Sequence, residues 1–112
     1  MRDTTIARNY AQALLALARK AGDLQAWGRM IHDVAPAIER DDRLRRFLEA
    51  PQISADQKNA VLAKAYEDRA PRLFLRYLQR LVMNRRQMLI PEIANEYRDL
   101  VDEAEGRVHA QV

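Results

Sequence analysis

Apolar residues recur three and four positions apart along almost the whole chain, and no run of β-branched residues alternates with polar ones. The first spacing is that of an amphipathic helix, whereas strict alternation would indicate a strand. Only three glycines and four prolines interrupt the pattern. The sequence therefore predicts an all-α fold, a single bundle of six helices.

Capping residues and prolines set the expected helix limits. The first expected helix covers residues 6–21, with Thr4 or Thr5 as N-cap and Gly22 after its end, and the second begins after Asp23. A short third helix contains residues 44–48 and ends at Pro51, and a fourth begins at the capping box of Ser54 and Gln57. The fifth covers residues 72–84 after Pro71, and the sixth begins at Pro91 and ends at Gly106.

Two details of these helices are open to test. Pro36 lies inside the second helix, and because proline removes an amide donor and crowds the preceding turn, a kink or an early end is expected there. Apolar spacing also predicts the buried positions of the last elements. They are Val61, Leu62, Ala65 and Tyr66 in the fourth helix, and Ile93, Ala94, Tyr97, Leu100, Val101 and Ala104 in the sixth.

The first and fifth helices differ from the others because they are apolar nearly all round. Helices of that kind lie in the centre of a bundle or under a partner. We therefore place these two helices centrally. A bundle of six helices in 112 residues can surround only a couple of its helices on all sides. Part of the apolar surface of these two helices is therefore left for a partner.

Composition narrows the class of protein. A chain of 112 residues with 48% hydrophobic content can bury one core, so one domain is expected. The absence of cysteine excludes disulfides, thiolate chemistry and Cys-based zinc sites. The longest mostly apolar stretch, residues 10–18, is about half the length needed to cross a bilayer, and residues 2–5 show no targeting pattern. A cytosolic protein is expected.

No residue set in the sequence indicates catalysis or metal binding. Ser54 is the only serine and is explained by capping, while His32 and His109 have no neighbouring ligands. The pair Asp41 and Asp42 falls between two predicted helices, where a cap or loop role is the commoner one. We expect no catalytic residue, no metal and no cofactor.

Residues 69–86 carry six arginines and no acidic residue, whereas the chain as a whole has a net charge of +3. Four of the arginines, Arg69, Arg72, Arg76 and Arg80, can share one helical face. One interpretation is a small helical nucleic-acid-binding module that contacts phosphates through this stripe. The other is a solvated face, or pairing with the acidic residues Glu92, Glu96, Asp99 and Glu103 of the sixth helix. The second is favoured, because base-reading Asn, Gln or Ser residues are scarce beside the arginines.

Three sequence blocks in order resemble the δ subunit/OSCP family of F-type ATP synthases. Residues 6–14 resemble its A-R-x-Y-A-x-A-L start, and residues 47–58 its L-x-x-P-x-I-x-x-x-x-K middle. Residues 81–93 resemble L-x-x-N-x-R-x-x-x-L-P-x-I, with Ile90 in place of a leucine, and residues 105–112 resemble the passage into a smaller C-terminal domain. Pro36 departs from the pattern.

The resemblance implies a non-catalytic stator component that contributes to proton-driven ATP synthesis. It implies a helical bundle over residues 1–105, with 106–112 starting a linker to a C-terminal domain absent from this chain. A groove on the first and fifth helices would bind the N-terminal helix of an α subunit, and the missing domain would engage the peripheral-stalk b subunit. No nucleic acid would bind, and contact with the membrane, at the cytoplasmic side of the bacterial inner membrane, would be indirect.

Residue character suggests which faces of the two helices form this groove. Small and aliphatic residues of the first helix suit the bundle interior: Ala7, Ala11, Leu15 and Ala18. On the fifth helix the expected interior residues are Phe74, Leu75, Leu78 and Val82. The mixed faces remain for the partner, since aromatic and arginine residues are favoured at interfaces. The predicted groove residues are Ile6, Tyr10, Ala13, Leu14, Leu17, Leu73, Tyr77, Arg80, Leu81 and Asn84. The alternative is that all of these belong to the core.

Overall fold

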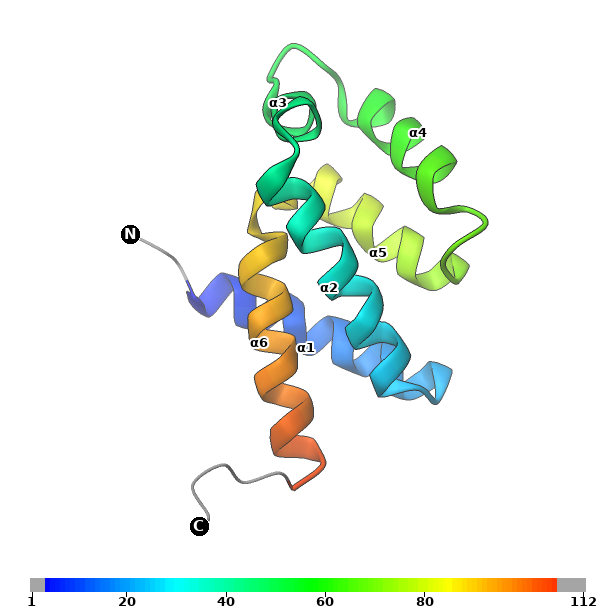
Figure 1. Cartoon of the computed structure of the whole chain (residues 1–112), viewed down its shortest axis with the longest axis vertical. Coiled ribbons are helices and arrows are strands. Elements are labelled where there is room, and N and C mark those ends of the chain that lie inside the picture. The colour runs from blue at the N-terminus through cyan, green and yellow to red at the C-terminus, as the bar shows by residue number, and fades with distance from the viewer. Residues whose placement is uncertain (1–3, 107–112) are drawn as a thin grey trace.

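The computed structural model describes residues 4–106, and every regular element in that range is helical (Figure 1). The elements are α1 (Thr4–Ala21), α2 (Leu24–Arg40), α3 (Asp42–Glu49), α4 (Ala55–Tyr66), α5 (Arg72–Met83), the short 3-10 helix η1 (Gln87–Leu89) and α6 (Ile90–Ala104). The predicted all-α bundle of six α-helices is therefore confirmed over the described residues. None of these helices combines the length and the apolar content that crossing a bilayer requires.

Local capping signals place most helix ends where the sequence predicts them. Gly22 follows α1 with a φ of 78°, a left-handed conformation that glycine adopts at low cost. The Asp23 side chain accepts a hydrogen bond from the Ala26 amide at 2.9 Å and caps α2. At α4 the Ser54 hydroxyl accepts from the Gln57 amide while the Gln57 side chain accepts from the Ser54 amide, each at 3.1 Å. These ends are set by residues adjacent in sequence, so the prediction holds.

Two helix limits differ from the prediction. Helix α1 begins at Thr4, so Thr4 and Thr5 lie inside the helix and not before it. Helix α2 does not have the early end that was one of the two outcomes expected at Pro36, but continues to Arg40. The reason is tertiary packing: Ile38, beyond the proline, is buried in the same apolar stripe as Ile31. This burial offsets the loss of one backbone hydrogen bond at Pro36.

The buried stripe of α4 is narrower than predicted. Leu62 is buried and Tyr66 half-buried, but Val61 is 44% exposed and Ala65 is also exposed, so the prediction is wrong for these two residues. Lys58 is buried instead, giving a stripe at four-residue spacing. Helix α4 packs mainly against α5, and a single neighbour covers only one narrow face of a helix.

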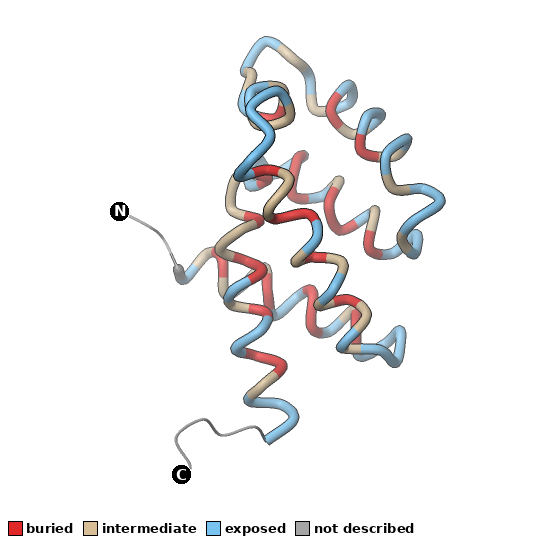
Figure 2. Tube along the Cα trace, viewed as in Figure 1, coloured by how far each residue is buried: buried red, intermediate tan, exposed pale blue. Residues whose placement is uncertain are grey.

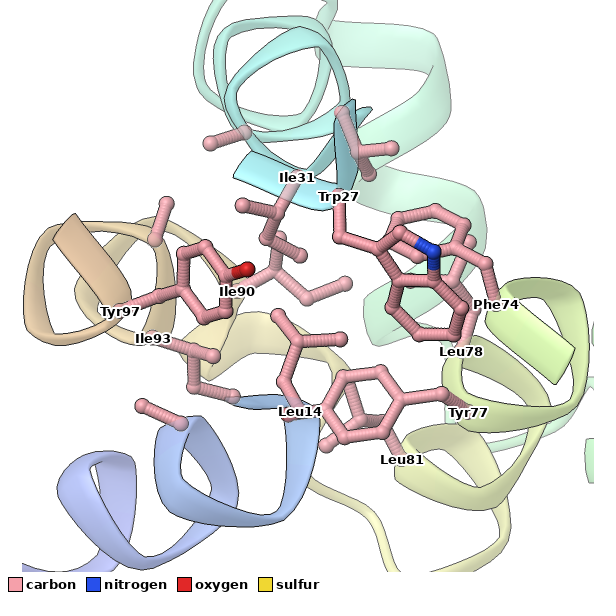
Figure 3. Close-up of a cluster of buried hydrophobic side chains, with 14 of the residues drawn as sticks. Leu14, Trp27, Ile31, Phe74, Tyr77, Leu78, Leu81, Ile90, Ile93 and Tyr97 are labelled. Atoms are coloured by element: carbon pink, nitrogen blue, oxygen red, sulfur yellow. The ribbon is translucent and has the colours of Figure 1, made fainter. Parts of the chain in front are cut away.

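The core lies between α1, α2, α5 and α6. Helix α6 packs against both α1 and α2, so it shares the central position that the sequence predicts for the first and fifth helices (Figure 1). Its predicted stripe is buried except for Ala104, which is exposed near the helix end. The rings of Trp27 and Phe74 meet edge to face, with centroids 5.6 Å apart, and join α2 to α5 (Figure 3). Buried positions line the inward sides of all these helices (Figure 2).

The half-buried His32 on α2 makes stability depend on pH. Burial, and secondly the nearby charge of Arg98, lowers the pKa of His32, while a backbone hydrogen bond with Ala94 and then the charge of Asp33 act in the opposite direction. The unfolded chain, with a pKa of about 6.5, then binds a proton at a higher pH than the folded chain. Stability is therefore fully present above the unfolded pKa and declines as the pH falls through the lowered folded pKa.

We expect urea unfolding to show a lower free energy of unfolding at pH 5.5 than at pH 7.5, with a smaller difference in a His32→Gln variant. His109 lies outside the described residues and is present in both proteins, so its contribution cancels in the comparison. An equal loss in the two proteins would show that His32 does not cause the pH dependence.

Candidate functional site

Helices α1 and α5 pack against one another through a hydrogen-bonded seam. The Tyr77 hydroxyl of α5 donates to the Tyr10 backbone carbonyl of α1 at 2.6 Å, and the Asn84 side-chain amide donates to the Tyr10 hydroxyl at 3.0 Å. Burial, and secondly the neighbouring Tyr10, raises the pKa of the Tyr77 hydroxyl. Tyr77 therefore stays protonated at neutral pH and remains a donor in this link between the two helices.

The ten predicted groove residues all lie on these two helices or, for Asn84, directly after α5, but at different depths. Leu14 and Leu81 are fully buried, and Tyr77, whose hydroxyl forms part of the seam, is 6% exposed, so these three belong to the core (Figure 3). The others reach the surface: Ile6, Tyr10 and Leu17 are half-buried, and Ala13, Leu73, Arg80 and Asn84 are exposed. We call the seven accessible residues the α1–α5 face. That they contact a partner stays a prediction.

The opposite sides of both helices form the interior, as predicted from residue size. On α1 the buried residues include Ala7, Ala11, Leu15 and Ala18. On α5 they include Phe74, Leu78 and Val82, while Leu75 is half-buried. These alanines and aliphatic residues allow close approach of neighbouring helices. Interior and exterior sides of the two helices are thus separated much as the sequence indicates.

The α1–α5 face carries one large, exposed apolar side chain, and a second lies beside the face on α5. Leu73 is 44% exposed in the first turn of α5, and Met83 in its last turn is 56% exposed. Met83 is not one of the seven residues of the face. Its spacing of three residues from Arg80 and seven from Arg76 places it next to these arginines on the surface of α5.

The arginine stripe does not pair with α6. Arg69, Arg72, Arg76 and Arg80 are all exposed, and none forms an ion pair with any residue in the range 4–106. Two of the acidic residues of α6 contact Arg8 of α1 instead: its guanidinium lies 3.3 Å from Glu96 and 3.4 Å from Glu103. The predicted pairing of the stripe with α6 is therefore wrong, because α6 packs along α1 and not along α5.

The described residues give no sign of a catalytic or metal centre. Ser54 is used as a helix cap, and Asp41 caps α3 by accepting from the Arg43 and Leu44 amides. Between residues 4 and 106 no three His, Asp or Glu side chains come together in a way that could hold a metal ion. His109 lies outside this range. The α1–α5 face is the strongest candidate for a functional site on structural grounds.

The fold and this face define a class: a small helical domain with a candidate surface for binding another protein. Comparison with known proteins identifies the family. The sequence matches the ATP synthase delta (OSCP) subunit family over residues 6–112. The chain belongs to this family.

Individual relatives agree with the family match. The ATP synthase subunit delta of Gemmatimonas aurantiaca is 60% identical over 108 residues, which are 96% of this chain and 58% of the relative. That of Symbiobacterium thermophilum is 36% identical over 112 residues, 100% of this chain and 60% of the relative. That of Thioalkalivibrio sulfidiphilus is 34% identical over 109 residues, 97% of this chain and 61% of the relative. The chain thus spans about 60% of the length of these curated relatives.

Proposed function

We propose that this chain is the N-terminal domain of a δ subunit and serves as a non-catalytic stator component of F1Fo ATP synthase. In this role the α1–α5 face holds the N-terminal helix of an α subunit. The contact with the peripheral-stalk b subunit belongs to a C-terminal domain outside these 112 residues. The domain then lies at the cytoplasmic side of the bacterial inner membrane and meets the membrane only through the complex.

The observation that carries this proposal is the exposed apolar surface of two helices that are hydrogen-bonded side by side. Leu73 is exposed on α5, while Ile6 and Leu17 are half-buried on α1. An amphipathic helix recognises such a surface by placing residues at positions i, i+3, i+4 and i+7 along it. The family match favours this reading over the nucleic-acid module, for which the arginine stripe was the only ground.

Mechanical coupling makes a specific demand on this face. A stator must resist torque, so its attachment needs slow dissociation, which depends on packing quality more than on buried area. The hydrogen bonds that Tyr77 and Asn84 donate to Tyr10 fix α1 and α5 relative to one another before a partner arrives. A pre-formed face loses little conformational entropy on binding, which favours a tight complex.

The test is a calorimetric titration of the 112-residue chain with a synthetic peptide of the cognate α subunit's N-terminal segment. We expect saturable binding with one peptide per chain. Fluorescence of Trp27 gives a second signal, because its buried ring contacts Phe74 on the inner side of α5. Absence of binding by both methods at peptide concentrations up to the millimolar range would exclude the proposed partner.

A further inference from the structure

The two helices of the α1–α5 face carry charge of only one sign. Neither Thr4–Ala21 nor Arg72–Met83 contains an acidic residue. The cations are Arg8, Arg19, Lys20, Arg72, Arg76 and Arg80. Of these, Arg8 points to α6 and is neutralised there by Glu96 and Glu103. The other five cations form no ion pair with any residue in the range 4–106.

Three of these free cations border the apolar part of the face. Lys20 follows Leu17 by three residues on α1, while Arg76 and Arg80 follow Leu73 by three and seven residues on α5. Residues at these spacings are neighbours on a helix surface. All three cations are exposed. The apolar strip is therefore flanked by unpaired positive charge on both helices.

The polar groups of the seam add hydrogen-bond donors to this surface. The Tyr10 hydroxyl accepts a hydrogen bond from Asn84, and among the described residues its own O–H donates to no acceptor. Guanidinium and ammonium groups only donate, and a phenol that already accepts has its proton left to donate. A partner that satisfies this face must therefore supply acceptors, above all carboxylates.

We infer that the α1–α5 face selects an amphipathic helix whose polar flanks are acidic, with carboxylates three or four residues apart opposite Arg76 and Arg80. The inference rests on the proposed function for its claim that a helix binds here, and it adds the charge that this helix must carry. A second copy of the chain is a poor occupant, because two faces of the same positive charge would repel one another.

Exposed charge pairs at the edge of an interface act mainly on association. They raise the rate of encounter, and salt largely screens the attraction beyond a Debye length of about 8 Å at physiological ionic strength. Steering of this kind changes association rates by about tenfold to a thousandfold. We therefore expect the sign of the partner's charge to appear in the association rate and in its salt dependence.

The experiment uses three synthetic helical peptides with one shared Leu/Ile stripe and with flanks of Glu, Gln or Lys. Association with the 112-residue chain is followed by stopped-flow fluorescence at about 10 mM and 500 mM salt, across which the Debye length falls from about 30 Å to about 4 Å. We expect the Glu peptide to associate at least about tenfold faster than the Lys peptide at low salt, and the difference to shrink at high salt. Equal rates for the three peptides would overturn the inference.

A pair of double variants locates the effect. Arg76→Gln with Arg80→Gln should remove most of the preference for the Glu peptide. Arg43→Gln with Arg46→Gln on α3 changes the net charge equally, at exposed arginines that make no ion pair with the described residues, and should retain it. Equal losses in the two proteins would mean that net charge alone attracts the peptide, which also overturns the inference.

The α-subunit peptide, measured in parallel, separates this inference from the proposed function. If the α-subunit peptide binds while the Glu and Lys peptides associate at equal rates, the proposed partner is supported and the inferred preference for an acidic helix is wrong. If the α-subunit peptide does not bind but the Glu peptide does, the preference for an acidic helix is supported and the proposed partner is wrong.

Discussion

Ala13→Asp should weaken binding of the α-subunit peptide by about a hundredfold, close to 3 kcal/mol. Ala13 is exposed in the domain alone and lies on one helical surface with Ile6, Tyr10 and Leu17, at spacings of seven, three and four residues. A docked helix would cover this position. The carboxylate would then lose water without gaining a matched partner, and an uncompensated buried charge costs several kcal/mol.

A matched control for this variant is Ala60→Asp. Ala60 is exposed in the middle of α4, which lies on the other side of α5 from α1 (Figure 1). Both changes lower helix propensity equally, so circular dichroism and thermal unfolding should give similar results for the two proteins. Only Ala13→Asp should lose affinity. If both variants bind like the unmodified chain, or if Ala13→Asp unfolds, the assignment of Ala13 to the docking surface is wrong.

A third variant, Ala13→Lys, distinguishes exclusion of a long polar side chain from repulsion of charge. Lysine can extend its ammonium to the edge of an interface while its stem covers apolar surface. With an acidic partner, Ala13→Lys should therefore bind more tightly than Ala13→Asp. The reverse order would contradict the inferred acidity of the bound helix without affecting the location of the face.

Helix ends were predictable because their causes are local. Asp23, Ser54 and Gly22 act on amides or torsion angles within three residues of themselves, so sequence alone specifies the result. Of the two outcomes expected at Pro36, the early end does not occur, and the reason is not local. The helix continues because Ile38 is buried by other helices, and no local rule contains that information.

The sequence predicted which side of each helix faces outward at the candidate site, but not how deeply each residue is buried. Residue size correctly separated the inner side of α1, where Ala11 is buried, from the side that carries Ala13. It did not show that Leu14, Tyr77 and Leu81 are buried in the core. Their burial depends on how closely the two helices approach, which is a property of the whole packing arrangement.

Charge pairing was also beyond the reach of sequence. The acidic stripe of α6 matches the arginine stripe of α5 in spacing, yet it contacts Arg8 of α1. Many cations satisfy the spacing criterion, and topology decides between them. This outcome has a functional consequence, because it leaves Arg76 and Arg80 available to an external partner.

The α1–α5 face depends on the core behind it, and Trp27 is the residue that tests this dependence. Trp27 is 2% exposed, and its ring contacts Phe74, so it supports α5 from the side opposite the face (Figure 3). Trp27→Ala should lower the free energy of unfolding by about 3–5 kcal/mol, because a large cavity opens and an aromatic pair is lost. For a domain with a total stability of about 5–15 kcal/mol, that is a large fraction.

Urea unfolding followed by circular dichroism measures this loss, and Trp27→Phe is the matched control. Phenylalanine keeps a ring against Phe74 and leaves a smaller cavity, so its cost should be clearly lower than that of alanine. Where Trp27→Ala remains folded, affinity for the α-subunit peptide should also fall, since α5 loses the contact that holds it against α2. A loss below about 1 kcal/mol would be inconsistent with a core position. If the free energy of unfolding falls by the expected amount but peptide affinity is unchanged, the Trp27 contact is not needed for the face, and the hydrogen bonds of Tyr77 and Asn84 suffice to maintain it.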